Sequence, residues 1–422
     1  MRRLGLLLKL AIRNVRRQTR RSLLTAAATV LGNAVMVFSV SLGDGAHEDW
    51  IEQGVRLGQG HIAIQHPRFQ ASRHLDDRLS PAALERARAA LAAPEVGGRV
   101  VVVAPRLEVQ GLASSATNAI PVLVTGVDPA TEARFSHLID WVTEGRYLEP
   151  GDRLSAFIGR RLADRLDLQL GSRLVLTGQD ATGQIAGQFV RVVGIFRSGI
   201  PEVDEGLVHI PLATAQEWLG VPGAVTSLAV LLRSSAWVDG TRNRLRRALD
   251  GERTDLTVLD WREATPELDA AIRVDNLGNY VFYVILFAIV GLAIINTLLM
   301  AVLYRTREFG VLRALGLTRD ETGAVAFSEG VLLTFASGVL GLALGLLVTW
   351  GFFRHGLDYS GLLKGDFTVS GVILNPVIVP LFRINRLLQM ASALLAIGLL
   401  ASLYPAIRAR RIDVAEAMKF EA

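Results

Sequence analysis

Two long apolar runs separated by a short charged segment constrain the fold of this chain more than any other feature. Residues 280–303 contain no charged side chain, and neither do residues 330–353, which follow directly on Glu329. Each run has about 24 residues and would measure about 36 Å as an α-helix, enough to cross a bilayer core of about 30 Å with some tilt. The sequence therefore predicts two membrane spans joined as a hairpin.

The segment between the two runs is short, charged and amphipathic. Basic residues near the ends of spans mark the cytoplasmic side of a membrane, and four lie here: Arg305, Arg307, Arg313 and Arg319. Apolar positions recur at helical spacing, with charged residues beside them: Phe309, Leu312, Leu315 and Gly316. Such a helix is suited to docking on a partner, although a hairpin that only rests among lipid headgroups would show the same pattern.

Two further spans are predicted, one near each end of the chain. Residues 22–42 are uncharged and exceed the 7–15 apolar residues of a signal peptide, so we expect a retained span. Residues 387–407 form the last span. Basic residues cluster in residues 1–21 and after residue 407, which places both termini in the cytoplasm. The N-terminal cluster indicates an anchor on anionic lipid, and we expect no nucleic acid partner.

The chain is 50% apolar and 20% charged, which fits a few spans combined with a large water-exposed domain. Between residues 43 and 279 no window is apolar enough to span. Short β-like runs alternate with helical pieces there, the runs being 61–65, 99–103, 120–124, 173–177, 189–196, 207–210 and 228–232, and the helices 81–92, 159–167, 212–219 and 238–249. These patterns predict an α+β domain.

The predicted fold is thus a membrane α-helical protein with four transmembrane helices and a large α+β periplasmic domain inserted between spans 1 and 2. Its parts are a cytoplasmic interfacial helix (1–21), span 1 (22–42), the periplasmic domain (43–279), span 2 (280–304), a cytoplasmic coupling helix (305–322), span 3 (323–353), a periplasmic loop (354–386), span 4 (387–407) and a cytoplasmic tail (408–422).

The motifs of several enzyme classes do not occur in the sequence. There is no GxxxxGK[ST] loop for ATP, no HExxH, no GxSxG and no cysteine, and the seven histidines lack tight ligand spacing. We therefore expect no catalytic residue, cofactor or metal in this chain. Glu329 is the one acid among the spans, which disfavours an ion-coupled transporter, and we expect it to pair with an arginine of the hairpin loop. Asn33, Gly341 and Gly345 are expected to pack helices together.

Two segments carry a resemblance to a known family. The segment REFGVLRALG (307–316) is similar to the coupling helix of the FtsX-like or MacB-like permeases of type VII ABC transporters. The tail PAIRARRIDVAEAMK (405–419) resembles their terminal motif, with Val414 where the family usually has Pro. Within that superfamily, three segments resemble the lipoprotein-releasing LolC/LolE branch: SLGDGAHEDW, GHIAIQHPRF, and the stretch from IGRRLADRLDLQLGSRLVL to FVRVVGIFRSGIPEVDEGLVHIPLATAQEWL.

This resemblance implies a bacterial inner-membrane permease subunit that extracts lipoproteins. The work would come from a separate cytoplasmic ATPase dimer of the LolD type, which would bind ATP and Mg. A second permease subunit, either a second copy or a paralogue, would complete the transporter, and a periplasmic carrier or adaptor would receive the cargo. The residues implied for ATPase coupling are Arg307, Glu308, Phe309, Gly310, Leu312, Arg313, Leu315 and Gly316.

The resemblance also implies a lateral opening toward membrane lipid, between spans 1 and 2 of facing subunits. The residues expected there are Val37, Phe38, Val40, Phe282, Ile285 and Leu286, for which ordinary packing or lipid contact is an equal alternative. Two other functions stay open. One is an efflux permease of a tripartite, MacB-like exporter, and the other is an FtsX-like mechanotransmitter that controls a cell-wall hydrolase.

Overall fold

The computed structural model describes residues 19–249, 255–358, 368–369, 372–373 and 377–412. Most of the predicted interfacial helix and the end of the predicted tail lie outside these ranges. The chain divides into two compact units. We call residues Met1–Ala46, Val274–Tyr359 and Pro376–Ala422 the membrane unit, and residues His47–Arg273 with Ser360–Asn375 the inserted domain.

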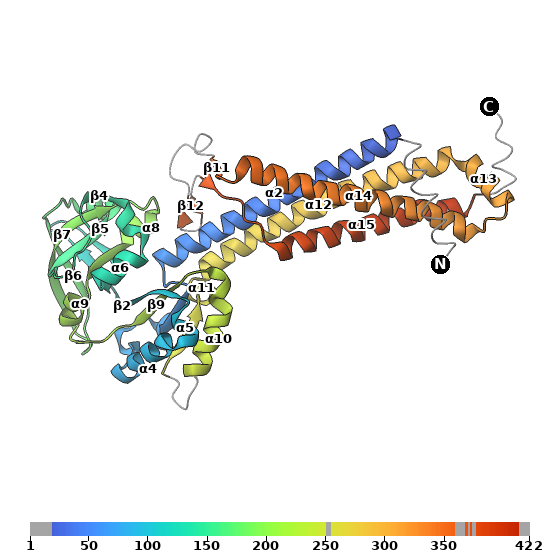
Figure 1. Cartoon of the computed structure of the whole chain (residues 1–422). Coiled ribbons are helices and arrows are strands. Elements are labelled where there is room, and N and C mark those ends of the chain that lie inside the picture. Colours follow the sequence, from blue (N-terminus) through green and yellow to red (C-terminus); the bar gives the residue numbers. More distant parts are fainter. Residues whose placement is uncertain (1–18, 250–254, 359–367, 370–371, 374–376, 413–422) are drawn as a thin grey trace. The chain divides into compact units, whose positions relative to one another are not determined.

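Within the described ranges, four helices are long and apolar enough to cross a membrane, as predicted (Figure 1). They are α2 (Thr19–Leu57), α12 (Pro266–Tyr304), α14 (Arg319–Phe353) and α15 (Ile384–Arg410). Helices α2 and α12 are longer than the predicted spans, because α2 continues past residue 42 and α12 begins well before residue 280. Between α14 and α15, the described residues form short strands: β11 (Leu357–Asp358) pairs with β14 (Val377–Ile378), and β12 (Thr368–Val369) with β13 (Val372–Ile373).

Small and polar residues bring α2 and α14 close together. The Asn33 side chain donates a hydrogen bond of 2.8 Å to the Gly338 carbonyl. A Cβ atom on Gly341 would lie 2.8 Å from the Val30 carbonyl oxygen, and one on Gly345 would lie 2.7 Å from Cβ of Val37. Neither contact is tolerated by a real Cβ, so the glycines permit this approach. The predicted packing roles of Asn33, Gly341 and Gly345 are confirmed.

The inserted domain is built on one ten-stranded mixed sheet. Its strand order is β10-β1-β9-β2-β3-β8-β5-β7-β4, with β6 pairing β2 and β7. The strands are β1 (Ile62–Gln65), β2 (Val100–Ser114), β3 (Ala119–Val127), β4 (Val142–Gly145), β5 (Ser155–Gly159), β6 (Arg173–Gln179), β7 (Ile185–Phe196), β8 (Leu207–Pro211), β9 (Ser227–Leu232) and β10 (Thr257–Asp260). The β3–β8 and β5–β7 pairs are parallel, and the other pairs are antiparallel.

Helices cover the sheet (Figure 1). They are α3 (Phe69–Ser72), α4 (Pro81–Ala92), α5 (Pro94–Gly97), α6 (Pro129–Phe135), α7 (Arg160–Leu166), α8 (Pro201–Gly206), α9 (Leu212–Trp218), α10 (Val238–Leu249) and α11 (Trp261–Ala264). Each of the seven β-like runs predicted from the sequence falls on an observed strand, and each predicted helix on an observed one. The sequence analysis missed β4, β5 and β10.

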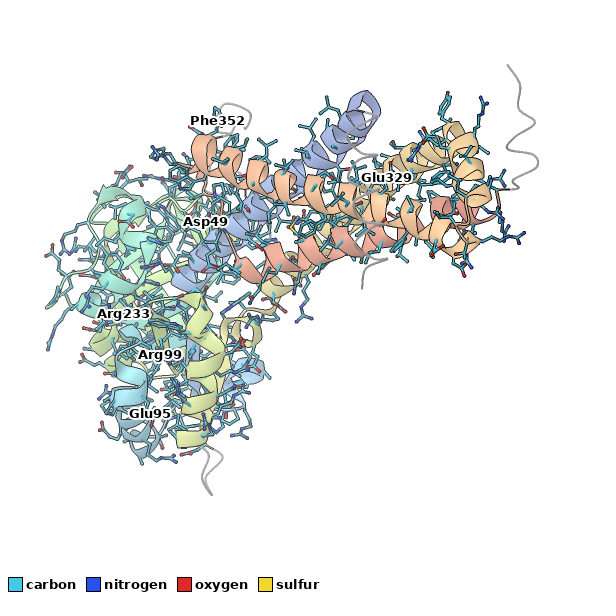
Figure 2. All side chains as sticks on the ribbon, turned by 45° about the vertical axis from the view of Figure 1, so that its right-hand side comes forward. Asp49, Glu95, Arg99, Arg233, Glu329 and Phe352 are labelled. Atoms are coloured by element: carbon cyan, nitrogen blue, oxygen red, sulfur yellow. The ribbon has the colours of Figure 1, made fainter. Side chains whose placement is uncertain are left out.

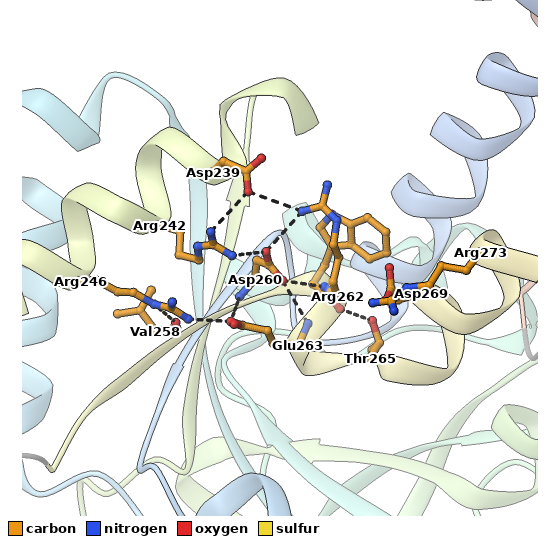
Figure 3. Close-up of polar contacts among 11 residues, drawn as sticks. Asp239, Arg242, Arg246, Val258, Asp260, Arg262, Glu263, Thr265, Asp269 and Arg273 are labelled. Atoms are coloured by element: carbon orange, nitrogen blue, oxygen red, sulfur yellow. Dashed lines mark hydrogen bonds and ion pairs between the residues drawn. The ribbon is translucent and has the colours of Figure 1, made fainter. Parts of the chain in front are cut away.

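Within the inserted domain, the chain enters from α2 and leaves into α12 through adjacent strands. Strand β1, which follows α2, pairs antiparallel with β10, which precedes α11 and α12, so that Ile62 lies opposite Asp260. Asp260 is buried and caps α11 by accepting hydrogen bonds of 3.0 Å from the backbone amides of Arg262 and Glu263. Its other oxygen pairs with Arg242 at 2.6 Å (Figure 3). A satisfied carboxylate therefore closes this end of the ladder.

A buried ion pair holds the end of α2. Arg106 on β2 pairs with Glu132 on α6 at 2.6 Å and donates another hydrogen bond to the Gly58 carbonyl. Its guanidinium also lies 4.6 Å from the centre of the Phe135 ring. Because charges this deeply buried persist only when they are fully paired, this contact fixes where α2 ends and β1 begins.

Candidate partner-docking site

The hairpin between α12 and α14 contains a separate short helix, α13 (Thr306–Ala314). Glu308 lies in its first turn and Arg313 in its last, the arrangement that suits a helix dipole. Gly316 then takes a φ of 104°, a conformation that favours glycine, and turns the chain. Thr318 and Glu321 form a capping box that starts α14. The segment predicted as one coupling helix over 305–322 is thus a helix, a glycine turn and the first residues of α14.

Arg305 connects this short helix to α14. Its Nη1 lies 3.0 Å from Glu329 and its Nε lies 2.8 Å from Glu308, while the guanidinium lies over the Phe309 ring at 5.1 Å. Arg305 and Glu329 are both buried, and Glu329 is labelled in Figure 2. The predicted pairing of Glu329 with a loop arginine is confirmed. This pair couples the position of α13 to that of α14.

The buried side chain of Phe309 anchors α13 to the neighbouring helices. This side chain is 1% exposed and packs in a small apolar cluster with Val302, Val325, Ala326 and Ala409. Two polar contacts reinforce the cluster: Arg313 donates to the Ile412 carbonyl, and Arg410 pairs with Asp320 at 2.5 Å. We call α13 together with this cluster the hairpin base. The helix is therefore packed against α12, α14 and α15.

The outward face of α13 differs from the stripe read in the sequence. Phe309 and Gly310 are buried, and Leu312 and Arg313 are half-buried. Arg307, Glu308, Leu315 and Gly316 are exposed, Leu315 by 78%. Of the eight residues expected to couple to an ATPase, these last four lie on the face that a partner can reach.

Two exposed residues near this face were missed by the sequence analysis. Val311 on α13 is 43% exposed, and Tyr304 at the end of α12 is 76% exposed. Val311 lies four residues from both Arg307 and Leu315, so the three share one face of a helix. This i, i+4 spacing could have identified the exposed face from the sequence, but the Phe309–Leu312–Leu315 stripe obscured it. A short helix with apolar and charged residues exposed together, on a fixed support, is an arrangement for binding another protein.

The six residues expected at a lateral opening divide between two environments. On α2, Val37 is buried against Gly345, Val40 is also buried, and the Phe38 ring lies 4.9 Å from the ring of Phe353. On α12, Phe282 is 45% and Ile285 54% exposed, and Leu286 is half-buried. Val37 and Phe38 thus face α14 and Val40 is buried, whereas the α12 residues are available to lipid or to another subunit.

No group of three His, Asp or Glu side chains suited to a metal occurs within the described ranges. His61 is buried, accepts a hydrogen bond of 3.2 Å from the Leu232 amide, and its pKa is lowered by burial. His66 instead lies 3.3 Å from Asp77. The two histidines serve separate local contacts.

Comparison with known proteins assigns both halves of the chain. Residues 22–248 match the MacB-like periplasmic core domain, and residues 280–414 match the FtsX-like permease C-terminal family.

Curated relatives span most of the chain at low identity. The chain is 22% identical to the lipoprotein-releasing system transmembrane protein LolC of Neisseria meningitidis serogroup B, covering 76% of this chain and 79% of that protein. LolC of Xylella fastidiosa is 24% identical, with 76% and 78% covered. The macrolide export ATP-binding/permease protein MacB of Brucella abortus is 23% identical, with 84% of this chain and 55% of that protein covered.

Proposed function

This chain belongs to the type VII ABC permeases that combine a MacB-like periplasmic core domain with an FtsX-like permease region, and from this membership we propose that it is the membrane subunit of a lipoprotein-releasing transporter. In this proposal the membrane unit receives work from a cytoplasmic ATPase dimer, which binds ATP and Mg. The inserted domain lies in the periplasm, and both termini lie in the cytoplasm. A second permease subunit, identical or paralogous, completes the assembly.

The observation that carries the proposal is the hairpin base. Its outward face offers Arg307, Val311 and Leu315 to a partner, while Phe309 and the Arg305–Glu329 pair fix it to three long helices. In this proposal, these contacts pass a force applied to that face on to α12 and α14. This is the arrangement expected of a subunit that is moved by an ATPase.

Lipoprotein release is favoured over other cargo by the LolC relatives, which cover about three quarters of the chain. Extracting a lipoprotein from the membrane requires a large input of free energy. Removing a sixteen-carbon acyl chain from lipid costs about 12 kcal/mol, at about 0.8 kcal/mol per CH₂. A lipoprotein with several chains therefore requires a driven step, and a periplasmic carrier to accept the apolar product.

Export of a small molecule or peptide is the second candidate, because the MacB relative covers 84% of this chain. Depletion of the chain in its host separates the two. Release of lipoproteins predicts that outer-membrane lipoproteins accumulate in the inner membrane, as measured by fractionation, with drug susceptibility little changed. Normal lipoprotein sorting with increased drug sensitivity would favour export and refute our proposal.

The ATPase contact is testable directly because the chain contains no cysteine. A Leu315→Cys variant labelled with a photoreactive maleimide should cross-link to an ATPase in native membranes, and mass spectrometry should identify that partner. The matched control is Leu292→Cys, which is similarly exposed, at 65% against 78%, but lies in the middle of α12. Equal cross-linking from both positions would contradict docking at α13.

A further inference from the structure

The short 3₁₀-helix η3 (Ser235–Trp237) of the inserted domain contacts α2 soon after that helix leaves its uncharged run. The Ser235 hydroxyl donates a hydrogen bond to the Glu48 carboxylate. Helix α2 is continuous up to Glu48, which lies six residues beyond residue 42, the end of the uncharged run. Six residues of α-helix rise by about 9 Å. A headgroup layer adds about 5–8 Å to each side of a bilayer core, so this contact holds η3 within reach of lipid headgroups.

Trp237, the last residue of η3, presents an aromatic ring at the surface of the inserted domain. The residue is 39% exposed, and the Arg99 guanidinium lies 5.6 Å from the centre of its ring. Tryptophan is enriched where a membrane meets water, because its ring is apolar and its N–H is polar. The cation–π contact keeps the guanidinium beside the ring, so an aromatic group and a positive charge are presented together.

A second arginine lies next to Arg99. The Arg233 amide donates a hydrogen bond of 3.0 Å to the Arg99 carbonyl where β2 begins and β9 ends, and both residues are labelled in Figure 2. Arg233 is exposed and Arg99 is half-buried. Within the described ranges, neither guanidinium forms a hydrogen bond or an ion pair. Because a guanidinium can donate two parallel hydrogen bonds to phosphate oxygens, both remain available to a phosphate group.

The acidic residues of this surface decide which ligand it suits. Asp239, at the start of α10, pairs with Arg242 and Arg262, each at 3.6 Å. Glu95 is exposed, four residues before Arg99, and offsets one positive charge. The surface is therefore not strongly basic and does not select anionic lipid. It suits the phosphate that every phospholipid carries, while the tryptophan ring suits the boundary between headgroups and hydrocarbon.

We propose that Trp237, Arg99 and Arg233 form a lipid anchor, which rests on the phospholipid headgroups of the leaflet on the side of the inserted domain. The guanidinium groups donate hydrogen bonds to lipid phosphate, and the indole ring lies among the headgroups and glycerol esters. The anchor attaches the domain to the membrane beside the helices that carry it. The proposal rests on α2 being a membrane span and not on the cargo, so its failure would leave the proposed function as it is.

The test uses the full chain, which has no cysteine, in nanodiscs of phosphatidylcholine. Ala236 is exposed in η3, and an Ala236→Cys variant carries an NBD fluorophore there. We expect lipid with a nitroxide on its headgroup to quench this label at least about twofold, and more strongly than lipid with a nitroxide in the middle of the acyl chain. The matched control is Ile185→Cys, 82% exposed at the start of β7. Figure 1 shows β7 far from α10, which begins directly after η3, so the control label should not be quenched.

Variants of the chain labelled in η3 test the arginines. Arg99→Glu with Arg233→Glu should lower the headgroup quenching at least about twofold, because carboxylates repel phosphate, and the corresponding Lys pair should retain it. Arg161→Glu with Arg173→Glu, at two exposed arginines elsewhere in the domain, is the matched control and should change nothing. No headgroup quenching in η3, equal quenching at the two labelled positions, or unchanged quenching in the first Glu pair would overturn the proposal. The comparison of the two labelled positions decides even if a charge variant fails to fold.

Discussion

Replacing Arg305 by methionine should strongly destabilise the membrane unit, because it leaves the Glu329 carboxylate buried without its partner. The Arg305 and Glu329 side chains are only 8% and 10% exposed. Removing one member of a buried pair costs about 3–5 kcal/mol, whereas replacing both by apolar groups of similar size is often close to neutral. Glu308, the other partner of Arg305, is half exposed and can be solvated, so it adds little to the cost.

The double variant Arg305→Met with Glu329→Met should therefore be more stable than Arg305→Met alone. We expect the two single changes and the double change to depart from additivity by at least about 2 kcal/mol. The assay is unfolding of the detergent-solubilised chain by increasing denaturant, with midpoints compared across the four proteins. Arg307→Met is the matched control, because Arg307 is exposed two residues away and should change stability by less than about 1 kcal/mol.

Additive losses in the double variant would refute this reasoning. They would mean that Glu329 is solvated after Arg305 is removed, so that the 3.0 Å contact is only an incidental surface pair. An Arg307→Met loss as large as that of Arg305→Met would refute it equally, because it would show that any basic residue of the hairpin contributes the same amount.

Three further predictions concern other parts of the chain. Leu315→Asp should abolish stimulation of the partner ATPase in reconstituted membranes without lowering the yield of inserted protein, whereas Phe309→Ala should destabilise the chain by about 3–5 kcal/mol. Gly345→Leu should separate α2 from α14, and a spin-label distance between these helices should increase; an unchanged distance would contradict the packing. Burial lowers the pKa of His209 to about 4, below its unfolded value near 6.5, so stability that is complete above pH 6.5 is lost as the pH falls toward 4. At pH 5 the free energy of unfolding should be about 2 kcal/mol lower than above pH 6.5, as measured by urea denaturation followed by tryptophan fluorescence. The variant His209→Gln should lack this pH-dependent loss.

Much of the architecture could be predicted from the sequence. Long uncharged runs indicate helices surrounded by lipid, and short β-like runs indicate strands of a water-exposed domain. The Glu329 pairing was predictable for the same reason, since a lone acid in an apolar run needs a partner. Strand β4 escaped prediction because three of its four residues are exposed, so it does not alternate between apolar and polar. Strand β5 reads SAFIG, in which only Phe157 and Ile158 favour a strand while Ala and Gly disfavour one.

The docking face was predicted only in part, and the reason is geometric. Helix α13 has apolar side chains on two sides, so its sequence does not indicate which side packs inward. The choice is made by Val302, Val325 and Ala409, which come from three other helices and enclose Phe309. Tertiary contacts of this kind lie far apart in the sequence and leave no local pattern.

The junction at β1 and β10 has a mechanical consequence. Helix α2 enters one strand and α12 leaves the other at the same end of the ladder, where Ile62 lies opposite Asp260. If the two helices spread apart, the hydrogen bonds between β1 and β10 are loaded one after another, starting at this end. If they move together along their length, all the ladder bonds share the load. Asp260 and its arginines lie where that separation would begin (Figure 3), so their ion pairs strengthen the strand pair at the point that is loaded first.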